Sequence, residues 1–533
     1  MKRMFALILV LMMIPACCFA SERISEEVIT VTVSGRSNQT ISWDETNMAK
    51  VIEERFGIRL VGNGYPDDTW KTQFTLMLAE ENLPDIILNP QISLAEVASY
   101  GSQGYFLDLK DLVAEHAPNI TATMETYPRL RNYSTSPDGN MYTLTQISVN
   151  VLALAPRFWL NKNWVENVGM EYPETLDDVY ELLKAFKEQD ANGNGDANDE
   201  IPLDANHEYT ISTFLNAFGF NTRQVSYLLQ ADEDGNVYLG ETTEAFKAYL
   251  TYMKQLWDEG LMCPEFFTEP GEQLNAQIAG DTVGLFGASA PYVSAGQEID
   301  YDANFYWAGA FTSDYRENAT IIKNSEVSGT PFVLVNAKTE HAEEIVKLLD
   351  FFYTEEGQVA GNNGFEGVDF DYQPVNVPGL EDKKTFTMYC PDGFASGEAY
   401  RTGKAVINNG FYFVKPLAGT PSDAILAATN DEQFELLLPA NGWLVQLTRY
   451  GINREGVEII DAFPSLIYEE DEAEERTQLY NDINSYLKNM QTQFITGEAD
   501  IEGDWDAFIE TLNSMGLEKL LEIEQNAYTR LMG

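Results

Sequence analysis

Basic residues are scarce in this sequence. Lysine and arginine together number 33, against 84 aspartates and glutamates, so the formal net charge is −51 at pH 7. A surface of this sign repels phosphate backbones and anionic lipid headgroups. We therefore expect no nucleic-acid partner.

Histidine and cysteine are also rare, and neither forms a catalytic motif. His116, His207 and His341 lie in no metal-binding or triad pattern, and neither H-E-x-x-H nor G-x-S-x-G occurs. Cys263 and Cys390 lack C-x-x-C spacing, which excludes a zinc or redox motif. An exported chain permits a disulfide between these two cysteines, and two free thiols are the alternative.

Long apolar runs are absent after the first twenty residues. Within residues 1–20, a basic start precedes the run Phe5–Ala16, which is too short for a permanent membrane span, so we expect a signal peptide and export. The stretch "IPAC" resembles the lipobox of bacterial lipoproteins. It predicts lipidation at Cys17 and anchoring by that lipid to the outer face of the cell membrane. The alternative is "CFA" before Ser21, a site for ordinary secretion to the periplasm or medium.

Strands and helices alternate in the first part of the chain. This pattern predicts parallel strand pairing and an α/β domain. The expected elements are a strand at Val28–Gly35, a helix at Asn47–Phe56, a strand at Ile58–Gly62, a helix at Trp70–Leu83 and a buried strand at Ile86–Leu88.

Helices dominate from Trp159 onward. The best marked of them follows Thr175, which forms a capping box with Asp178 and precedes apolar residues at the helical period. A strand pattern returns at Thr330–Asn336 and a helix at Ala342–Gly357, and the chain from Glu469 reads as acidic helix.

A βα pattern interrupted by a helical insert predicts two lobes joined by chain crossings, since 533 residues exceed one compact core. We expect residues 28–150 plus about 308–355 in the N-terminal lobe. Residues 151–307 plus about 356–533 would form a helix-rich C-terminal lobe.

The loop "DANGNGDANDEIP", Asp190–Pro202, is crowded with side-chain oxygens. Its start matches the calcium pattern D-x-[DN]-x-[DN]-G, and a tight loop can aim about six to eight oxygens at one Ca²⁺. The twelfth position, a bidentate Glu in that pattern, is Ile201, so one or both of the two preceding acids must close the site. We expect a structural calcium whose ligands are Asp190, Asn192, Asn194, Asp196, Asn198, Asp199 and Glu200.

The same loop carries a family resemblance. "YPETLDDVYELLKAFKEQDANGNGDANDEIPL" resembles the family 1 extracellular solute-binding proteins, in particular the large lipoprotein subgroup with alginate- and oligosaccharide-binding members. The family's loop is D-x-N-G-N-G closing on D-E-I-P, and this sequence has one extra residue before "DEIP". Similar motifs follow the family's order at "MLAEENLPDIIL", "DGNMYTLTQ", "WLNKNWVENVGM" and "NNGFEGVDFDY", and in the closing helices.

The resemblance implies a type II periplasmic-binding-protein fold, in which two α/β lobes hinge around a cleft. It also implies a monomer that captures a carbohydrate, an oligosaccharide in many members, and delivers it to the permease subunits of an ABC importer. The scarcity of bases favours a neutral sugar over a polyanionic one.

Candidate ligand-binding residues follow from the chemistry of a sugar. Aromatic rings stack on its apolar faces, and polar side chains bind its hydroxyl rim, at loops that leave the strand ends of a parallel sheet. For each aromatic residue, packing in the core is the alternative. In the first lobe the candidates are Arg36, Asn38, Trp70, Asn89 and Gln91, and in the second Trp159, Tyr292, Trp307, Glu366 and Trp443.

Two rival functions remain. A secreted glycoside hydrolase would use two carboxylates, but among 84 acids a pair of carboxylates is uninformative. A surface protein that binds glycans without transport would share the same fold. We expect a binding protein and no enzyme, because no catalytic motif is present.

Overall fold

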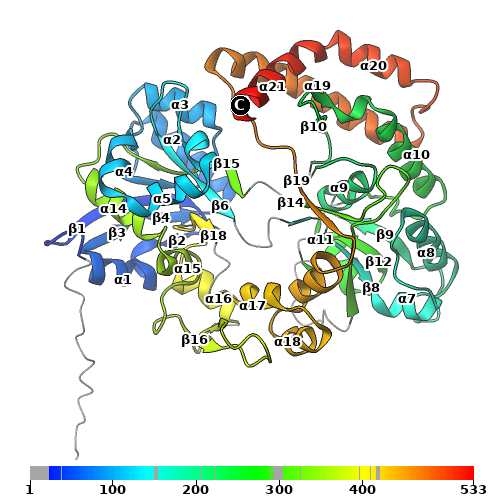
Figure 1. Ribbon diagram of the computed structural model, residues 1–533, viewed down its shortest axis with the longest axis horizontal. Helices are drawn as coiled ribbons and strands as arrows, with labels where there is room; N and C mark the ends of the chain where they lie inside the picture. Colours follow the sequence, from blue (N-terminus) through cyan, green and yellow to red (C-terminus); the bar gives the residue numbers. More distant parts are fainter. Residues whose placement is uncertain are drawn as a thin grey trace, which may run out of the picture.

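The computed structural model describes residues 23–532, apart from 38, 149–153, 156, 206, 223, 270, 289, 292–303, 324–325, 395, 409 and 416–419. The expected signal peptide and Cys17 lie outside the described residues, as do Asn38 and Tyr292. Two α/β lobes face each other in the ribbon, as the sequence predicted (Figure 1).

The described strands of the first lobe form an eight-stranded sheet in the order β18-β6-β15-β5-β1-β4-β2, with β3 also paired to β1. β1 runs parallel to β3, β4 and β5, as the alternation of strands and helices predicted, whereas β15 is antiparallel to β5. The strands are β1 (Ile29–Arg36), β2 (Ile41–Ser42), β3 (Ile58–Val61), β4 (Asn63–Tyr65), β5 (Ile86–Leu88), β6 (Thr143–Ser148), β15 (Val327–Val335) and β18 (Val414–Lys415).

Helices cover this sheet, and local caps fix where they begin and end. Thr46 caps α1, and Gly57 ends it at a left-handed φ of 74°. The expected helix Ala342–Gly357 is two helices, because Thr354 accepts a hydrogen bond from the Gly357 amide and starts a new one. The helices are α1 (Asn47–Phe56), α2 (Asp67–Ala79), α3 (Leu94–Ser102), α4 (Lys110–His116), α5 (Pro118–Thr126), α6 (Pro128–Ser134), α14 (Ala342–Phe351), α15 (Glu355–Asn363) and α16 (Gly397–Tyr400).

The second lobe is built on the four-stranded sheet β13-β8-β12-β9. Its strands are β8 (Phe158–Asn161), β9 (Ile201–Ala205), β12 (Val283–Gly287) and β13 (Phe305–Ala308). Its helices are α7 (Lys162–Val168), α8 (Leu176–Glu188), α9 (His207–Ala217), α10 (Glu244–Asp258), α11 (Gly271–Ala279), α17 (Pro421–Ala427), α18 (Asp431–Leu447), α19 (Glu470–Thr496), α20 (Trp505–Ser514) and α21 (Leu517–Met532). The capping box of Thr175 and Asp178 is present at the start of α8, which confirms that prediction.

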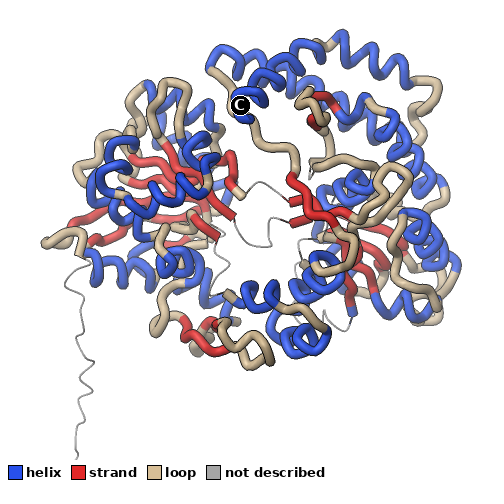
Figure 2. Tube along the Cα trace, in the orientation of Figure 1, coloured by secondary structure: helices blue, strands red, loops and turns tan. Residues whose placement is uncertain are grey.

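The chain crosses between the lobes at several points, since elements that follow one another in the sequence belong to different lobes (Figure 2). It passes from β6 to β7 (Leu154–Ala155), from β14 (Thr320–Lys323) to β15, and from β18 to α17. β14 pairs with both β7 and β19 (Glu458–Asp461) in a small sheet beside these crossings. The hairpin of β16 (Phe370–Pro374) and β17 (Lys384–Met388) adds a further link, since residues of its turn pack in the core with α17 and α18.

The packing moves both internal lobe boundaries from the positions expected from the sequence. Residues 308–323 contribute to the second lobe, where Ile321 packs in the core beside Trp307. Tyr400 and Phe413 instead pack in the first lobe, and β18 pairs there with β6. A return to the first sheet after residue 356 leaves no periodic signal in the sequence, because it uses a two-residue strand and short turns.

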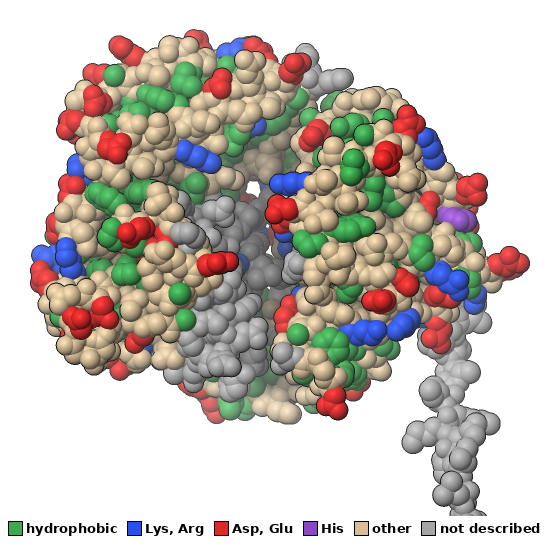
Figure 3. All heavy atoms as spheres, turned by 180° about the vertical axis from the view of Figure 1, so that it is seen from behind, with side chains coloured by type: hydrophobic (Ala, Val, Ile, Leu, Met, Phe, Trp, Pro, Cys, Tyr) green, Lys and Arg blue, Asp and Glu red, His purple; other side chains and the backbone are tan. Residues whose placement is uncertain are grey.

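The two cysteines within the described residues are free thiols, Cys263 buried and Cys390 exposed, so no disulfide joins them. Among residues 23–532, no helix combines the length and the apolar character that crossing a membrane requires. Seen from behind, acidic side chains are spread over both lobes, and the surface is hollowed between them (Figure 3).

Candidate functional site

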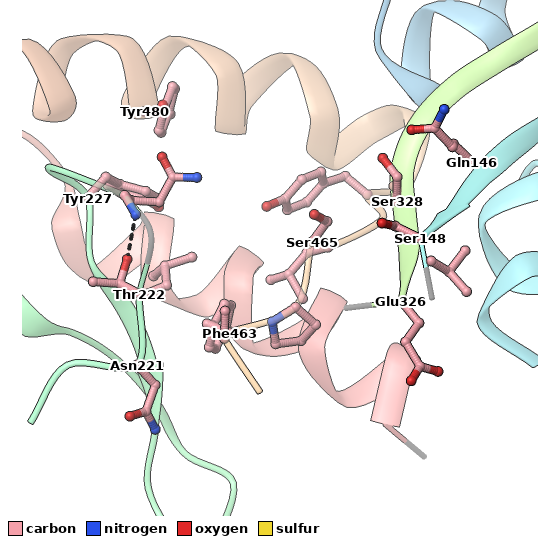
Figure 4. A pocket seen from close by; sticks show the side chains of 18 of the residues that line it. Gln146, Ser148, Asn221, Thr222, Tyr227, Glu326, Ser328, Phe463, Ser465 and Tyr480 are labelled. Carbon is pink, nitrogen blue, oxygen red and sulfur yellow. Dashed lines mark hydrogen bonds between the residues drawn. The ribbon is translucent and has the colours of Figure 1, made fainter. Parts of the chain in front are cut away.

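A pocket of about 600 Å³ lies where the two lobes meet. The first lobe contributes the end of β6, the start of β15 and β18. The second lobe contributes α19 and the residues Asn221, Thr222, Gln224, Ser226, Tyr227 and Leu229. The segment between β19 and α19 lines it between those walls (Figure 4). Because both lobes line the pocket, a relative movement of the lobes changes its shape.

The lining combines hydroxyls, amides and aromatic rings. Phe463 and Ser465 lie near the middle of the pocket, and Tyr480 extends from α19 above them (Figure 4). The ring of Phe463 is held by stacking on Tyr528, with centroids 5.4 Å apart. The uncharged polar members of the lining, tyrosines apart, are Gln146, Ser148, Asn221, Thr222, Gln224, Ser226, Ser328 and Ser465, and its charged members are Glu326, Lys415 and Arg476.

Arg476 on α19 is the centre of a buried charged cluster at this wall. Its Nε donates to Glu524 Oε1 at 3.0 Å, and Glu524 is fully buried. The hydroxyls of Tyr227 and Tyr468 also donate to Glu524, at 2.7 and 2.5 Å. The guanidinium carbon lies 4.2 Å from the ring centre of Tyr480. The charge of Arg476 is therefore neutralised, and three pocket tyrosines are held in place.

Burial and the adjacent Glu524 raise the pKa of Tyr227. Burial, followed by the same carboxylate, raises the pKa of Tyr468. Both hydroxyls therefore keep their protons at physiological pH and act as donors to Glu524.

A second buried carboxyl group, that of Glu241, lies beside Leu228, between the pocket-lining residues Tyr227 and Leu229 in the sequence. Glu241 is 1% exposed, its Oε2 accepts a hydrogen bond from the Leu228 amide at 2.9 Å, and its Oε1 has no hydrogen-bond partner. Desolvation raises the pKa of Glu241 from its usual 4.5 to about 7.

This raised pKa makes stability depend on pH in a known direction. The folded state binds the Glu241 proton more tightly than the unfolded chain does. The contribution of this proton to the free energy of unfolding is therefore fully present below pH 4.5 and is lost as the pH rises through about 7. We expect Glu241→Gln to stabilise the protein at pH 8 by about 2–3 kcal/mol, the order set by 1.36 kcal/mol for each pKa unit. Urea unfolding of both proteins at pH 5.5 and 8 measures the difference. The exposed Glu233→Gln serves as control, and an equal pH profile for Glu241→Gln and the unmodified chain would contradict this assignment.

Three predicted ligand contacts, Trp70, Trp159 and Trp307, are core residues, each no more than 1% exposed. The indole N–H of Trp70 donates to the Pro90 carbonyl, and that of Trp159 to the Ala288 carbonyl. Large rings at strand and helix positions gain more from burial in the core than from a cleft wall, which corrects their assignment to the ligand.

The polar candidates of the first lobe lie at the carboxyl ends of β1 and β5. Arg36 forms a two-pronged ion pair with Asp67. Asn89 and Gln91 adopt left-handed backbone conformations, with φ of 49° and 64°, and Gln91 Nε2 donates to Asn89 Oδ1 at 3.2 Å. Such strained backbone is typical of functional sites, so ligand contact by these residues stays a prediction.

The remaining candidates are placed as follows. Glu366 lies exposed in the turn between α15 and β16. Trp443 lies within α18, not in the non-helical segment expected from the sequence, and its side chain is outside the described part of the structure. Neither residue lines the pocket of Figure 4.

Sequence reasoning missed the residues that do line this pocket. Phe463 and Tyr468 are aromatic residues in a non-helical stretch, "AFPSLIYE", immediately before a helix. The criterion that selected tryptophans in irregular segments would also have selected these two. No comparable signal marks Gln146 or Ser328, because they belong to ordinary strands.

The oxygen-rich loop adopts a tight fold around its glycines. Gly193 and Gly195 have left-handed φ values of 72° and 95°, and the Gly195 amide donates to Asp190 Oδ2 at 2.9 Å. Asp190 Oδ1 and Glu200 Oε2 are buried and have no hydrogen-bond partner. Two orphaned carboxylate oxygens in one loop fit the coordination of a hard cation. Burial raises the pKa of Glu200, with a smaller contribution from the neighbouring carboxylate of Asp199.

The two acids that close the loop differ in what they contact. Asp199 Oδ1 accepts a hydrogen bond from the side-chain Nδ2 of Asn192 at 3.3 Å, and Asp199 Oδ2 accepts one from the side-chain Nδ2 of Asn194 at 2.7 Å. Glu200 Oε1 accepts from the Ala191 backbone amide at 3.0 Å, which leaves Oε2 without a protein partner.

A third group of acidic side chains lies deeper in the second lobe. One ligand atom each from Asp204, Cys263 and Glu269 lie within 4.8 Å of one another. The Cys263 thiol donates to Glu269 Oε2 at 3.1 Å, and burial together with Asp204 raises the pKa of that thiol. Cys263 is therefore a protonated donor in this arrangement and not a thiolate.

Two α/β lobes, several crossings between them and a pocket lined by both define the class: a two-lobed solute-binding protein. The particular family follows from the sequence. The chain belongs to the bacterial extracellular solute-binding proteins, whose family model matches residues 42–359.

Individual relatives agree with this placement. The fructooligosaccharide ABC transporter substrate-binding protein FusA of Streptococcus pneumoniae is 22% identical over 498 residues, 90% of this chain and 85% of FusA. Lipoprotein LipO of Bacillus subtilis is 25% identical over 421 residues, 74% of this chain and 78% of LipO. FusA in complex with kestose has a similar fold, with a TM-score of 0.70 and 19% identity over 94% of this chain and 99% of FusA. The alginate-binding protein AlgQ2, solved without calcium ion, gives 0.66 and 19% over 96% of this chain and 99% of AlgQ2.

Proposed function

We propose that this protein captures a neutral oligosaccharide in the interlobe pocket and delivers it to the permease subunits of an ABC importer. The observation that carries the proposal is a pocket with hydroxyls and amides from both lobes and with aromatic rings from the second lobe and from the segment before α19. Such a lining matches the apolar faces and hydroxyl rim of a sugar. Relatives with carbohydrate ligands, FusA among them, support this class of solute.

Charge supports a neutral sugar. The charged residues of the lining are Glu326, Lys415 and Arg476, and the charge of Arg476 is neutralised by the buried Glu524. These three residues and Glu524 together carry no net positive charge, so an acidic saccharide would lose hydration there without gaining a net attraction. Closure of the lobes over a neutral ligand removes both surfaces from water, which supplies the driving force.

We infer binding without chemistry, by a monomer held at the cell surface. The relatives are binding proteins, and LipO is a lipoprotein, which supports a lipid on Cys17. The mass of the amino-terminal peptide of the native protein tests the lipid.

A thermal-shift screen against neutral oligosaccharides, including kestose, with calorimetry of the hits tests the function. We expect a rise in melting temperature of several degrees, because a ligand at about a hundred times its Kd adds about 2.7 kcal/mol of stability. Labelled sugar should be recovered intact after incubation. Cleavage of the sugar would instead favour the glycoside hydrolase. If the protein binds sugars that are immobilised on a surface but no free oligosaccharide in solution, the result would favour a glycan-binding surface protein and would also contradict the proposal.

We further propose that the loop Asp190–Glu200 holds a structural Ca²⁺. Of the seven ligands expected from the sequence, Asp190, Asn192, Asn194 and Glu200 would supply side-chain oxygens, and Asp196 would supply its backbone oxygen. The buried Oε2 of Glu200, which has no hydrogen-bond partner, favours this residue over Asp199 as the closing ligand. The bound ion would neutralise the carboxylates and clip the loop to the end of α8.

A further inference from the structure

A second cavity continues from the interlobe pocket. It measures about 860 Å³ and lies between α3 of the first lobe and α19 of the second. The two cavities share Gly329, Leu466, Tyr468 and Arg476 in their linings. In Figure 1, α3 and α19 belong to opposite lobes and lie on the same side of the space between them.

Hydrogen bonds fix the side chains at the boundary between the two cavities. Tyr133, which lines the second cavity, donates from its hydroxyl to the Ser465 carbonyl at 2.7 Å, and Ser465 lines the first. Tyr468 and Arg476 are fixed by Glu524 at the same place. Because these groups are already paired with one another, a ligand that passes along them does not have to order them.

The second cavity has the same mixed chemistry as the first, with a more apolar wall on one side. Leu94, Ala95 and Ala98 project from α3, and Ser99 and Thr477 add hydroxyls from α3 and α19. Small side chains on α3 leave a flat apolar surface, which suits the face of a sugar ring. Each cavity alone is within the range of about 300–1,000 Å³ that holds a small ligand.

The charged side chains of the second cavity restrict the class of sugar that can occupy it. Among the described residues that line the second cavity, the acids are Glu96, Asp138 and Glu474, and Arg476 is the basic residue. Since Arg476 is already neutralised by Glu524, the field in this cavity is negative. A chain of uronates would be repelled there, whereas uncharged sugar units would not.

We infer that the two cavities form one extended site, which selects a neutral oligosaccharide long enough to reach from the interlobe pocket into the space between α3 and α19. This inference rests on the proposed function, because the sugar in the first pocket places the distal units in the second cavity. The site therefore discriminates by chain length as well as by charge.

Affinity measured as a function of chain length tests the inference. The probes are inulin-type fructo-oligosaccharides, maltodextrins and galacto-oligosaccharides, each from disaccharide to hexasaccharide, with oligogalacturonates as acidic comparison. We expect Kd to fall by about tenfold or more between the short and long members of the series that binds, equivalent to about 1.4 kcal/mol. The oligogalacturonates should bind at no length.

The variant Ala98→Phe fills the second cavity from the α3 side. We expect it to weaken binding of the long members by about tenfold and to leave the short members unchanged, since only long chains enter that cavity. Ala122→Phe, at an exposed position of α5, is the matched control and should bind like the unmodified protein. Melting curves without sugar establish that both variants fold.

The outcomes are distinguishable. If sugars bind but Kd is independent of length and Ala98→Phe has no effect, the extended site is refuted and the proposed function stands. If no neutral sugar of any length binds, the proposed function itself is refuted. Tight binding of oligogalacturonates would overturn the charge argument.

Discussion

Removal of calcium will lower the melting temperature of the protein by about 10 °C. An ion at roughly a thousand times its Kd contributes about 4 kcal/mol, and each kcal/mol shifts the melting temperature of a large domain by about 2–4 °C. The physical reason is the pair of buried oxygens on Asp190 and Glu200, which have no hydrogen-bond partner within the protein. Melting curves in excess chelator and in millimolar Ca²⁺ measure the effect, and elemental analysis should find one calcium for each chain.

Two variants isolate the loop. Asp190→Asn should melt at the same temperature with and without Ca²⁺, since it replaces a charged ligand. Asp232→Asn is the matched control, because Asp232 also opens an oxygen-rich turn, "DEDGN". Its Oδ1 accepts from the Asp234 and Asn236 amides and its Oδ2 from the Asn236 side chain, so no oxygen is orphaned. If the unmodified protein melts at the same temperature in chelator and in Ca²⁺, the proposed calcium site is refuted.

Arg476→Ala will destabilise the protein by about 3–5 kcal/mol, the usual effect of removing one partner of a buried ion pair. Glu524 is fully buried, with 0% solvent exposure, in the low-dielectric core. Without Arg476, the hydroxyls of Tyr227 and Tyr468 would be its remaining side-chain donors. The same variant removes the cation that positions Tyr480 and Tyr468 in the pocket. We therefore expect sugar binding to weaken in parallel, as measured by urea unfolding and calorimetry.

The double variant Arg476→Met, Glu524→Gln separates charge from packing. It removes both charges, keeps an acceptor for the tyrosines and should recover most of the lost stability. Arg59→Ala is the control for a surface pair, since Arg59 and its partner Glu53 are both substantially exposed, and it should leave unfolding unchanged. A single variant Arg476→Ala as stable as the unmodified protein would show that the cluster contributes nothing.

Much of the fold was predictable because its signals are local. The helix Asn47–Phe56 and the strand Ile86–Leu88 have the predicted bounds, and Thr175 caps α8 through atoms only three residues apart. The calcium loop could be proposed for the same reason, since its candidate ligands lie within eleven consecutive residues. Periodicity, caps and turn residues depend on neighbours along the chain, which a sequence displays directly.

The sequence by itself determined two α/β lobes, the acidic character that disfavours anionic ligands, and the oxygen-rich loop. Only the tertiary structure decided which aromatic rings lie in the core and which line the pocket, because burial depends on what packs against a ring and not on its own neighbours. It also decided the site: Gln146, Ser328, Phe463 and Arg476 are far apart in the chain and meet only because the crossings bring both lobes to one place. Local rules cannot place such a meeting, since it is set by the packing of one lobe on the other.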